Sequence, residues 1–325
     1  MNTDLTKKSC FSLLLRLVVS GLLLAVAYTS VDINSLIDTF KMLSPKTAIL
    51  LGIMYTTGQV FSALKWRKIV DGAGIKRGPA EIIRAYFFGM FVNTFALGTV
   101  GGDVARSLAL KPESGRRTIA LATAVADRVH GLLVLIAIGA ISSLFLHPRG
   151  PAEMIALVAG PILIVLCLGL WLGPRAVAHL LRNSKRFGPH AQQIAAAFPN
   201  RFRTVMTISS MSLVVHILQI SMHYFITSEL NANITLAYLF AVVPMVNVAS
   251  SLPLSINGLG IREGMYILLF TPLGISRETA VAFGAIWILI VTAVSALGGI
   301  IVSINNKIEF AKELRAVADE KSMVA

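Results

Sequence analysis

Long apolar runs, separated by short polar connections, dominate the chain. As helix, a run of about twenty residues crosses the hydrocarbon core of a bilayer, which is about 30 Å thick. The runs of this length are Cys10–Ser30, Lys46–Leu64, Thr118–Leu146, Ala152–Gly173, Thr204–Ser228 and Thr279–Ile304. The pattern predicts an all-α polytopic membrane protein with about six full transmembrane helices.

The first run has two interpretations. Lys7 and Lys8 precede it, and Ala25-Val26-Ala27 resembles the cleavage site of a secretory signal. The next apolar run follows closely, however, as expected within a polytopic protein. We therefore interpret the first run as a retained transmembrane helix, with a cleaved signal peptide as the alternative.

The composition excludes a large soluble domain. Of 325 residues, 55% are hydrophobic and 14% are charged, whereas globular proteins carry roughly a quarter charged residues. The chain has 29 Lys and Arg against 16 Asp and Glu, a bias typical of membrane proteins with basic cytoplasmic loops rather than of a nucleic-acid binder. Cys10 and Cys167 lie in apolar runs, and no phosphate-loop motif occurs, so we expect neither a metal site nor a cofactor.

Charge in the connections predicts the orientation. Residues 65–84 contain six basic and two acidic residues, residues 106–117 four basic and one acidic, and residues 174–204 six basic and none acidic. Cytoplasmic loops are enriched in Lys and Arg, so these three connections are expected in the cytoplasm. The N-terminus is then cytoplasmic too.

One apolar segment does not fit a simple span. Ala85–Val100 would form about 24 Å of helix, too short to cross, and basic connections flank it on both sides. We therefore predict a re-entrant hairpin over about residues 85–111 that enters from the cytoplasm, breaks at Gly101 and Gly102, and returns. Non-helical backbone at such depth is tolerated only where it is buried in protein or lines a wet cavity.

A similar break occurs in the second half of the chain. Ala237–Leu254 is apolar, and Gly258 and Gly260 follow it, so we predict a second, opposed hairpin over about residues 237–273. Paired glycine-interrupted segments in the two halves are typical of transporters built from inverted repeats. The alternative is that Ala237–Leu254 is a full span and that the last helix runs outward.

Two further observations concern the predicted hairpins. An asparagine precedes each break, Asn93 in the first half and Asn247 in the second, which adds to the inverted-repeat-like pattern. With two opposed hairpins, the last span runs inward, and the charged C-terminal tail of residues 305–325 is cytoplasmic.

Charged residues near the first break are candidate substrate ligands. Ionisable groups inside a membrane are costly and are usually functional. Asp103 and Arg106 share one face of a helix that starts near the glycines, because they lie three residues apart. The structural alternatives are that Asp103 only caps this helix and that Arg106 reaches back to the cytoplasmic surface.

Asp127, Arg128 and His130 lie deeper. They are about ten residues into a helix, or roughly 14 Å from its start, near the bilayer midplane. Asp127 and His130 share a face, whereas Arg128 points about 100° away from Asp127. We therefore expect Arg128 to take a partner from another element, Asp103 or Glu263, and we expect all three residues to contact substrate. A purely structural buried ion pair is the alternative.

The second break also carries charge. Arg262 and Glu263 begin the short helix after Gly260, where exposed N–H groups and a guanidinium would suit a phosphate. Glu263 in the first turn has the same capping alternative as Asp103.

At these residues the chain resembles a known family. Gly101-Gly102-Asp103 with Arg106 is similar to the Gly-Gly-Asp-x-x-Arg signature of the lysylphosphatidylglycerol synthase transmembrane-region family, also called flippase-like domain proteins. Asp127–Leu133 resembles its acidic-Arg-x-x-x-Leu-Leu segment, with Asp where Glu is more usual. Asn257–Gly264 resembles its Gly-x-Gly-x-Arg-Glu-Gly segment, and the three segments occur in family order.

The resemblance implies a single integral membrane domain over residues 1–325, with two re-entrant hairpins meeting between inverted halves. It also implies translocation of a lipid with a polar headgroup. Two-part members carry a soluble aminoacyl-transferase domain, which this sequence lacks, so lysyl-lipid synthesis by this chain is not expected.

Three functions are compatible with these residues. The first is a flippase of the bacterial inner membrane that moves a lipid with a phosphate-bearing headgroup, held by Arg128, Arg262 and Arg106. The second is an intramembrane transferase, with Asp103 or Glu263 as general base. The third is a non-transporting partner of a lipid-modifying enzyme. We favour the flippase, and hence no enzymatic activity.

Other partners are suggested by the surface. The basic connection of residues 174–204 can lie on anionic lipid of the inner leaflet. Nucleic acid is not an expected partner. A homodimer is compatible with the sequence, although no span carries a convincing GxxxG face.

Overall fold

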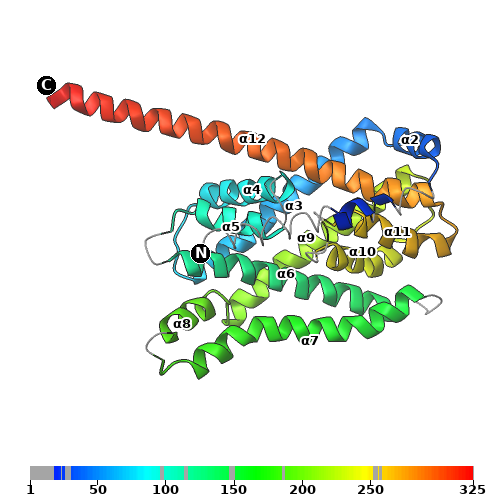
Figure 1. The fold of residues 1–325 in the computed structure, drawn as a ribbon, viewed down its shortest axis with the longest axis horizontal. Helices are drawn as coiled ribbons and strands as arrows, with labels where there is room; N and C mark the ends of the chain where they lie inside the picture. Colours follow the sequence, from blue (N-terminus) through cyan, green and yellow to red (C-terminus); the bar gives the residue numbers. More distant parts are fainter. Residues whose placement is uncertain are drawn as a thin grey trace.

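The structure is a computed structural model that describes residues 18–22, 24–25, 31–95, 99–112, 116–145, 151–184, 187–251, 255 and 258–324 (Figure 1). No strand occurs in these ranges. The helices are α2 (Ile33–Lys41), α3 (Pro45–Gly72), α4 (Pro79–Phe95), α5 (Thr99–Ala109), α6 (Arg117–Phe145), α7 (Pro151–Leu180), α8 (Gly188–Ala196), α9 (Phe202–Glu229), α10 (Leu236–Ser251), α11 (Ile261–Phe270) and α12 (Arg277–Val324), with a 3-10 turn η1 (Thr271–Leu273) after α11. Most of the predicted first span, Cys10–Ser30, lies outside the described residues.

The prediction of an all-α polytopic membrane protein is confirmed. Five described helices, namely α3, α6, α7, α9 and α12, are long and apolar enough to cross a membrane. They correspond to five of the predicted spans, and α6 agrees with its predicted run to within one residue at each end. Their large apolar side chains are exposed on the outside of the bundle, as on Leu166, Leu170 and Leu297, where lipid would solvate them.

The end of α3 was predicted wrongly. Lys65 was assigned to a cytoplasmic connection, but the helix runs on to Gly72, and Lys65 is buried. Ser44 caps the start of α3 through its hydroxyl, and no glycine or proline interrupts the helix between Gly58 and Gly72. Charge alone does not end a helix, so the basic residues after Leu64 simply continue it.

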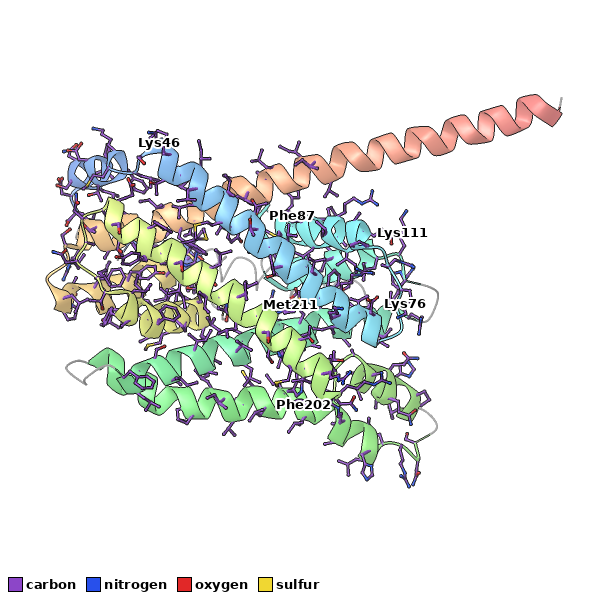
Figure 2. The ribbon with its side chains drawn as sticks, turned by 180° about the vertical axis from the view of Figure 1, so that it is seen from behind. Lys46, Lys76, Phe87, Lys111, Phe202 and Met211 are labelled. Carbon is purple, nitrogen blue, oxygen red and sulfur yellow. The ribbon has the colours of Figure 1, made fainter. Side chains whose placement is uncertain are left out.

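The helices α4 and α5 form a hairpin that begins and ends at the same end of the bundle. The Arg77 Nε donates a hydrogen bond to the Leu110 carbonyl at 2.9 Å. Arg116 donates to the Gly74 carbonyl, also at 2.9 Å, so the connections before α4 and after α5 are bound together. In Figure 2, Lys76 and Lys111 accordingly lie together, at the far end from Lys46.

The helices α10 and α11 form a second hairpin, at the opposite end. The Tyr238 hydroxyl, near the start of α10, donates to the Leu269 carbonyl near the end of α11, at 2.7 Å. Just before α10, Glu229 accepts a hydrogen bond from the Ser44 backbone N–H at 3.0 Å, which places this hairpin at the N-terminal end of α3. The hairpins therefore enter the bundle from opposite ends (Figure 1).

The position of the first break also differs from the prediction. Gly101 and Gly102 lie inside α5, which begins at Thr99, whereas α4 ends before them at Phe95. Gly102 serves close packing: a Cβ there would overlap the Gly89 carbonyl oxygen and the Asn93 side chain. Small residues let two helix backbones approach each other, which explains glycines without a break.

The second break lies where the sequence predicts it. Gly258 and Gly260 separate α10 from α11 and have φ angles of 75° and 79°, in the left-handed region that favours glycine. A Cβ at Gly258 would also come within 2.6 Å of the Ser250 Cβ. The turn therefore requires glycine at this position for both its conformation and its space.

The long C-terminal helix and the basic connection complete the fold. The helix α12 continues without interruption through residues 305–324 and projects beyond the bundle (Figure 1), so the predicted tail extends the last span. The connection of residues 174–204 contains the end of α7 and all of α8. Arg175 fastens it by donating to the Phe198 and Pro199 carbonyls.

A polar cavity between the two hairpins as candidate functional site

A cavity of about 420 Å³ lies between the two hairpins. It is lined by α3, α4, α6, α9, α10, α11 and α12, so both halves of the chain contribute. The asparagines noted in the sequence both line it, Asn93 from the first hairpin and Asn247 from the second. Its volume is within the range of small-molecule pockets, roughly 300–1,000 Å³.

A smaller cavity of about 270 Å³ adjoins it on the side of the first hairpin. The two share Gln59, Met90, Asn93, Arg128, Leu135 and Val215 in their linings. The smaller cavity also reaches most of the charged residues predicted in the first half. It thus connects these charges to the larger cavity, with Arg128 at the boundary.

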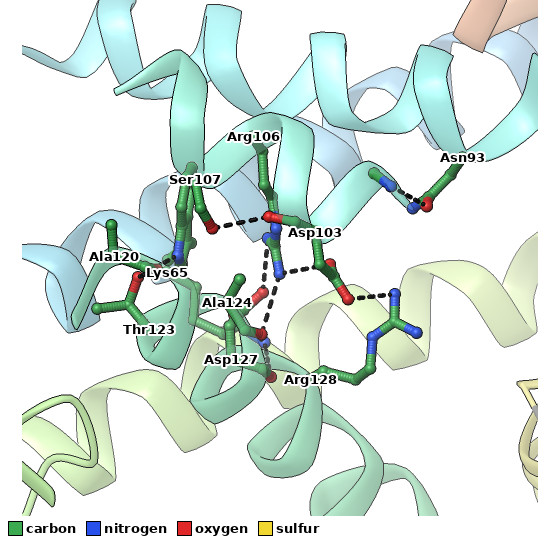
Figure 3. A network of polar contacts seen from close by, with 12 residues as sticks. Lys65, Asn93, Asp103, Arg106, Ser107, Ala120, Thr123, Ala124, Asp127 and Arg128 are labelled. Atoms are coloured by element: carbon green, nitrogen blue, oxygen red, sulfur yellow. Dashed lines mark hydrogen bonds and ion pairs between the residues drawn. The ribbon is translucent and has the colours of Figure 1, made fainter. Parts of the chain in front are cut away.

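Five charged side chains form a continuous chain of ion pairs along the smaller cavity (Figure 3). Asp127 lies between two cations, 2.9 Å from the Lys65 Nζ and 3.0 Å from an Arg106 guanidinium nitrogen. Asp103 also lies between two cations, 3.2 Å from Arg106 and 2.9 Å from Arg128. The order is therefore Lys65, Asp127, Arg106, Asp103 and Arg128, with alternating charge.

Arg106, in the middle of this chain, lies among carboxylates, a backbone carbonyl and aromatic rings. Its guanidinium donates to the Ala124 carbonyl at 3.2 Å and lies 4.7 Å and 5.1 Å from the ring centroids of Trp66 and Tyr86. The Trp66 ring is fixed in turn by a hydrogen bond to the Thr123 hydroxyl. Cation–π contacts and two carboxylates compensate a buried guanidinium. Arg106 therefore acts as the structural centre of the network.

Arg128 ends the chain of charges and faces the larger cavity. Its side chain is 33% exposed, against 7% for Arg106, and it lines both cavities. Asp103 is one of the two partners expected for it from the sequence. The pair with Asp103 orients the guanidinium.

Arg262, from the second hairpin, lines the larger cavity as well. Its Nε is buried and has no hydrogen-bond partner among the residues that the structure describes. The same is true, within that part of the chain, of three other lining atoms: the Asn247 Nδ2, the Ser250 Oγ and the Ser295 Oγ. Buried polar groups are nearly always paired, so such a cluster indicates a bound molecule or water.

Glu263 does not face this cavity. Its carboxylate accepts a hydrogen bond of 2.7 Å from the backbone N–H of Gly260, the N-cap residue of α11. The residue lines a separate, mainly apolar cavity of about 550 Å³ beside α12. The capping alternative is therefore the one that the geometry supports, and Glu263 is not the partner of Arg128.

His130 also lies outside both cavities. Its ring contacts the Ser209 and Ser212 hydroxyls and packs 5.3 Å from the centroid of Trp171. Contact with substrate at His130 is therefore not supported, although Asp127, three residues earlier, lines the smaller cavity. A histidine can share a helix face with a carboxylate and still point to a different neighbouring helix.

Several candidate functional residues could not be predicted from the sequence. Lys65 was assigned to a connection because basic residues cluster after it. Ser250 and Ser295 carry no signal in the sequence, since serines are common in transmembrane helices. For metal binding, no group of three or more His, Cys, Asp or Glu side chains comes together in the described ranges.

The fold and the cavity define a class: a multi-pass α-helical membrane protein with a charged, polar chamber enclosed by two broken helical hairpins. Residues 13–299 match the lysylphosphatidylglycerol synthase TM region, and the chain belongs to this family. The chain is also 25% identical over 297 residues to a UPF0104 membrane protein of Pyrococcus horikoshii, a match that spans 80% of this chain and 88% of that protein.

Proposed function

We propose that this protein translocates a lipid with a phosphate-bearing headgroup across the bacterial inner membrane, through the larger cavity. One observation carries the proposal: an arginine from each half of the protein, Arg128 on α6 and Arg262 on α11, lines one chamber between opposed hairpins. Guanidinium groups bind phosphate through several charge-assisted hydrogen bonds. The family to which the chain belongs supports a lipid-related role.

The physical difficulty in moving a lipid is the headgroup. The acyl chains remain in hydrocarbon throughout, whereas a phosphate loses its hydration when it enters the bilayer. A polar chamber inside the bundle replaces the lost water by fixed donors, and so lowers the barrier. The apolar outer surface of the bundle, by contrast, suits the acyl chains.

The orientation follows from charge. The connections that flank the first hairpin, together with residues 174–204, are basic, and we propose that they face the cytoplasm. Arg182, Arg201 and Arg203 are exposed at that end, where anionic lipid of the inner leaflet would attract them. The first hairpin then opens to the cytoplasm and the second to the outside.

The geometry favours transport over catalysis. The two carboxylates considered as general bases are both engaged, Asp103 with two arginines and Glu263 with the Gly260 N–H. A general base must be within hydrogen-bond reach of the proton that it abstracts. We therefore propose no enzymatic activity for this chain.

The test is reconstitution into liposomes of bacterial lipid with a fluorescent phosphate-bearing lipid, whose movement is followed by chemical quenching from outside. The wild type should accelerate movement, and Arg262→Gln should slow it by about tenfold or more, because several charge-assisted hydrogen bonds are lost. Arg203→Gln, an exposed arginine outside the cavity, is the matched control. The proposal fails if the folded wild type does not accelerate movement, or if Arg262→Gln equals it.

A further inference from the structure

The charges around the two cavities do not cancel. The larger cavity is lined by Arg128 and Arg262 and, among the described residues, by no carboxylate. The smaller cavity adds Lys65 and Arg106 as cations and two aspartates as anions. Among the described lining residues, four cations therefore face two carboxylates, which gives a formal charge of +2.

Each aspartate is already paired with two cations. Asp127 is held by Lys65 and Arg106, and Asp103 by Arg106 and Arg128, at distances between 2.9 and 3.2 Å. An ammonium group that approaches either aspartate would meet these cations at close range, and like charges in a desolvated site repel each other.

The unpaired atoms in the larger cavity point to the same ligand chemistry. The Asn247 Nδ2 and the Arg262 Nε are donors only, and the hydroxyls of Ser250 and Ser295 can donate as well. Phosphate oxygens accept hydrogen bonds and satisfy all four atoms. The phosphate of an ammonium lipid would do the same, so these atoms select a phosphate. The excess of cations among the described lining residues is what disfavours an ammonium group.

We infer that the headgroup moved by this protein has a net negative charge and carries no ammonium group. Its phosphate binds between Arg128 and Arg262, with Asn247, Ser250 and Ser295 as further donors. An anionic glycerophospholipid such as phosphatidylglycerol and a polyprenyl phosphate share this chemistry. Phosphatidylethanolamine and lysyl-phosphatidylglycerol, which both carry ammonium groups, are excluded as preferred substrates. The inference rests on the proposed function and narrows its substrate class.

Binding and transport are measured separately, so that the two proposals can fail independently. Native mass spectrometry of the purified protein, with an equimolar mixture of the four lipids, reports binding preference. Proteoliposomes with each lipid in turn report movement. We expect phosphatidylglycerol, polyprenyl phosphate or both to be bound and moved at least roughly tenfold better than either ammonium lipid, because like charges in a desolvated site repel. The preference between phosphatidylglycerol and polyprenyl phosphate shows whether the phosphate belongs to a glycerophospholipid or to a polyprenyl lipid.

One isosteric variant tests the charge argument directly. Asn247→Asp replaces the donating Nδ2 group by a carboxylate oxygen in a side chain of the same shape, which should reduce the preference for anionic lipids by about tenfold and admit phosphatidylethanolamine. Asn233→Asp, an exposed position outside both cavities, should leave the preference unchanged. Size-exclusion and circular dichroism profiles equal to the wild type show that each variant is folded. Arg262→Gln, which should lose selective binding, provides a second variant if Asn247→Asp does not fold.

The outcomes separate the two proposals. Equal or stronger binding of an ammonium lipid by the wild type overturns the inference, as does the absence of any lipid preference. An unchanged preference in both Asn247→Asp and Arg262→Gln overturns it as well. Selective binding of anionic lipid without movement in proteoliposomes leaves the charge selectivity standing and overturns the proposed function instead.

Discussion

Asp103 on α5 and Arg128 on α6 form an ion pair of 2.9 Å at the boundary between the two polar cavities. The pair joins the first hairpin to a transmembrane helix and presents Arg128 to the larger cavity. Asp103 thereby lowers the positive charge that a lipid phosphate meets.

Asp103→Asn should therefore strengthen binding of anionic lipid. Loss of the carboxylate leaves Arg128 with more positive potential toward the cavity, and we expect affinity to rise by roughly threefold to tenfold. Titration of the detergent-solubilised protein with phosphatidylglycerol measures this affinity. Weaker binding would mean that Asp103 acts mainly by holding Arg128 in position.

Asp127 should be the more important carboxylate for stability. Asp127→Asn leaves Lys65 and Arg106, both nearly buried, with a neutral partner, and should cost about 3 kcal/mol or more. Thermal unfolding in detergent should show a melting temperature several degrees lower. Asp38→Asn is the matched control, because its ion pair with Lys41 has a similar distance of 2.8 Å but is exposed. Equal melting temperatures for the two variants would contradict the buried network.

Gly102 should not tolerate a side chain. In Gly102→Ala the new methyl group overlaps Gly89 and Asn93, so α4 and α5 must separate, and we expect a loss of about 1–3 kcal/mol in stability. Gly52→Ala, on α3, meets nothing within 4 Å and should be neutral or stabilising by about 0.5–1 kcal/mol. Thermal unfolding of the two variants compares their stabilities. A Gly102→Ala protein more stable than the Gly52→Ala protein would refute the close packing of the hairpin.

Glu263 should act through its hydrogen bond rather than its charge. Glutamine keeps an acceptor for the Gly260 N–H, so Glu263→Gln should retain transport and stability. Glu263→Ala removes the acceptor and should lower stability by about 1 kcal/mol. Liposome transport together with thermal unfolding distinguishes these effects. Loss of transport in a stable Glu263→Gln protein would assign the charge a direct role.

The proposed orientation predicts which positions can be labelled from outside. Asn183, in the basic connection, and Asn233, between α9 and α10, are both exposed and lie at opposite ends of α9. With Cys10 and Cys167 replaced by serine, an impermeant thiol reagent added to whole cells should label Asn233→Cys but not Asn183→Cys. The reverse pattern would invert the orientation.

The sequence predicts most of the spans because their apolar runs are long. Its errors arise where tertiary contacts override local signals. Lys65 follows an apolar run and resembles the start of a loop, yet Asp127, sixty-two residues later, compensates its charge inside the bundle. Gly102 resembles a helix break, yet it lies inside α5 because α4 packs against it.

The site was predictable only in part. Asp127 and Arg128, which the sequence indicates as deep charges, both line a polar cavity. The two asparagines, which the sequence shows only as a repeated pattern, line the larger cavity as well. The sequence does not predict that Arg106 is enclosed whereas Arg128 faces the cavity. This difference depends on the Trp66 and Tyr86 rings, which enclose one guanidinium and leave the other facing the cavity.

An electron cryo-microscopy structure of the protein in nanodiscs of bacterial lipid would show directly whether the larger cavity binds a lipid phosphate. We expect density for the phosphate within hydrogen-bond distance of Arg128 and Arg262, with the acyl chains leaving toward the bilayer. A cavity that holds only water, with lipid phosphates confined to the two membrane surfaces, would contradict this expectation.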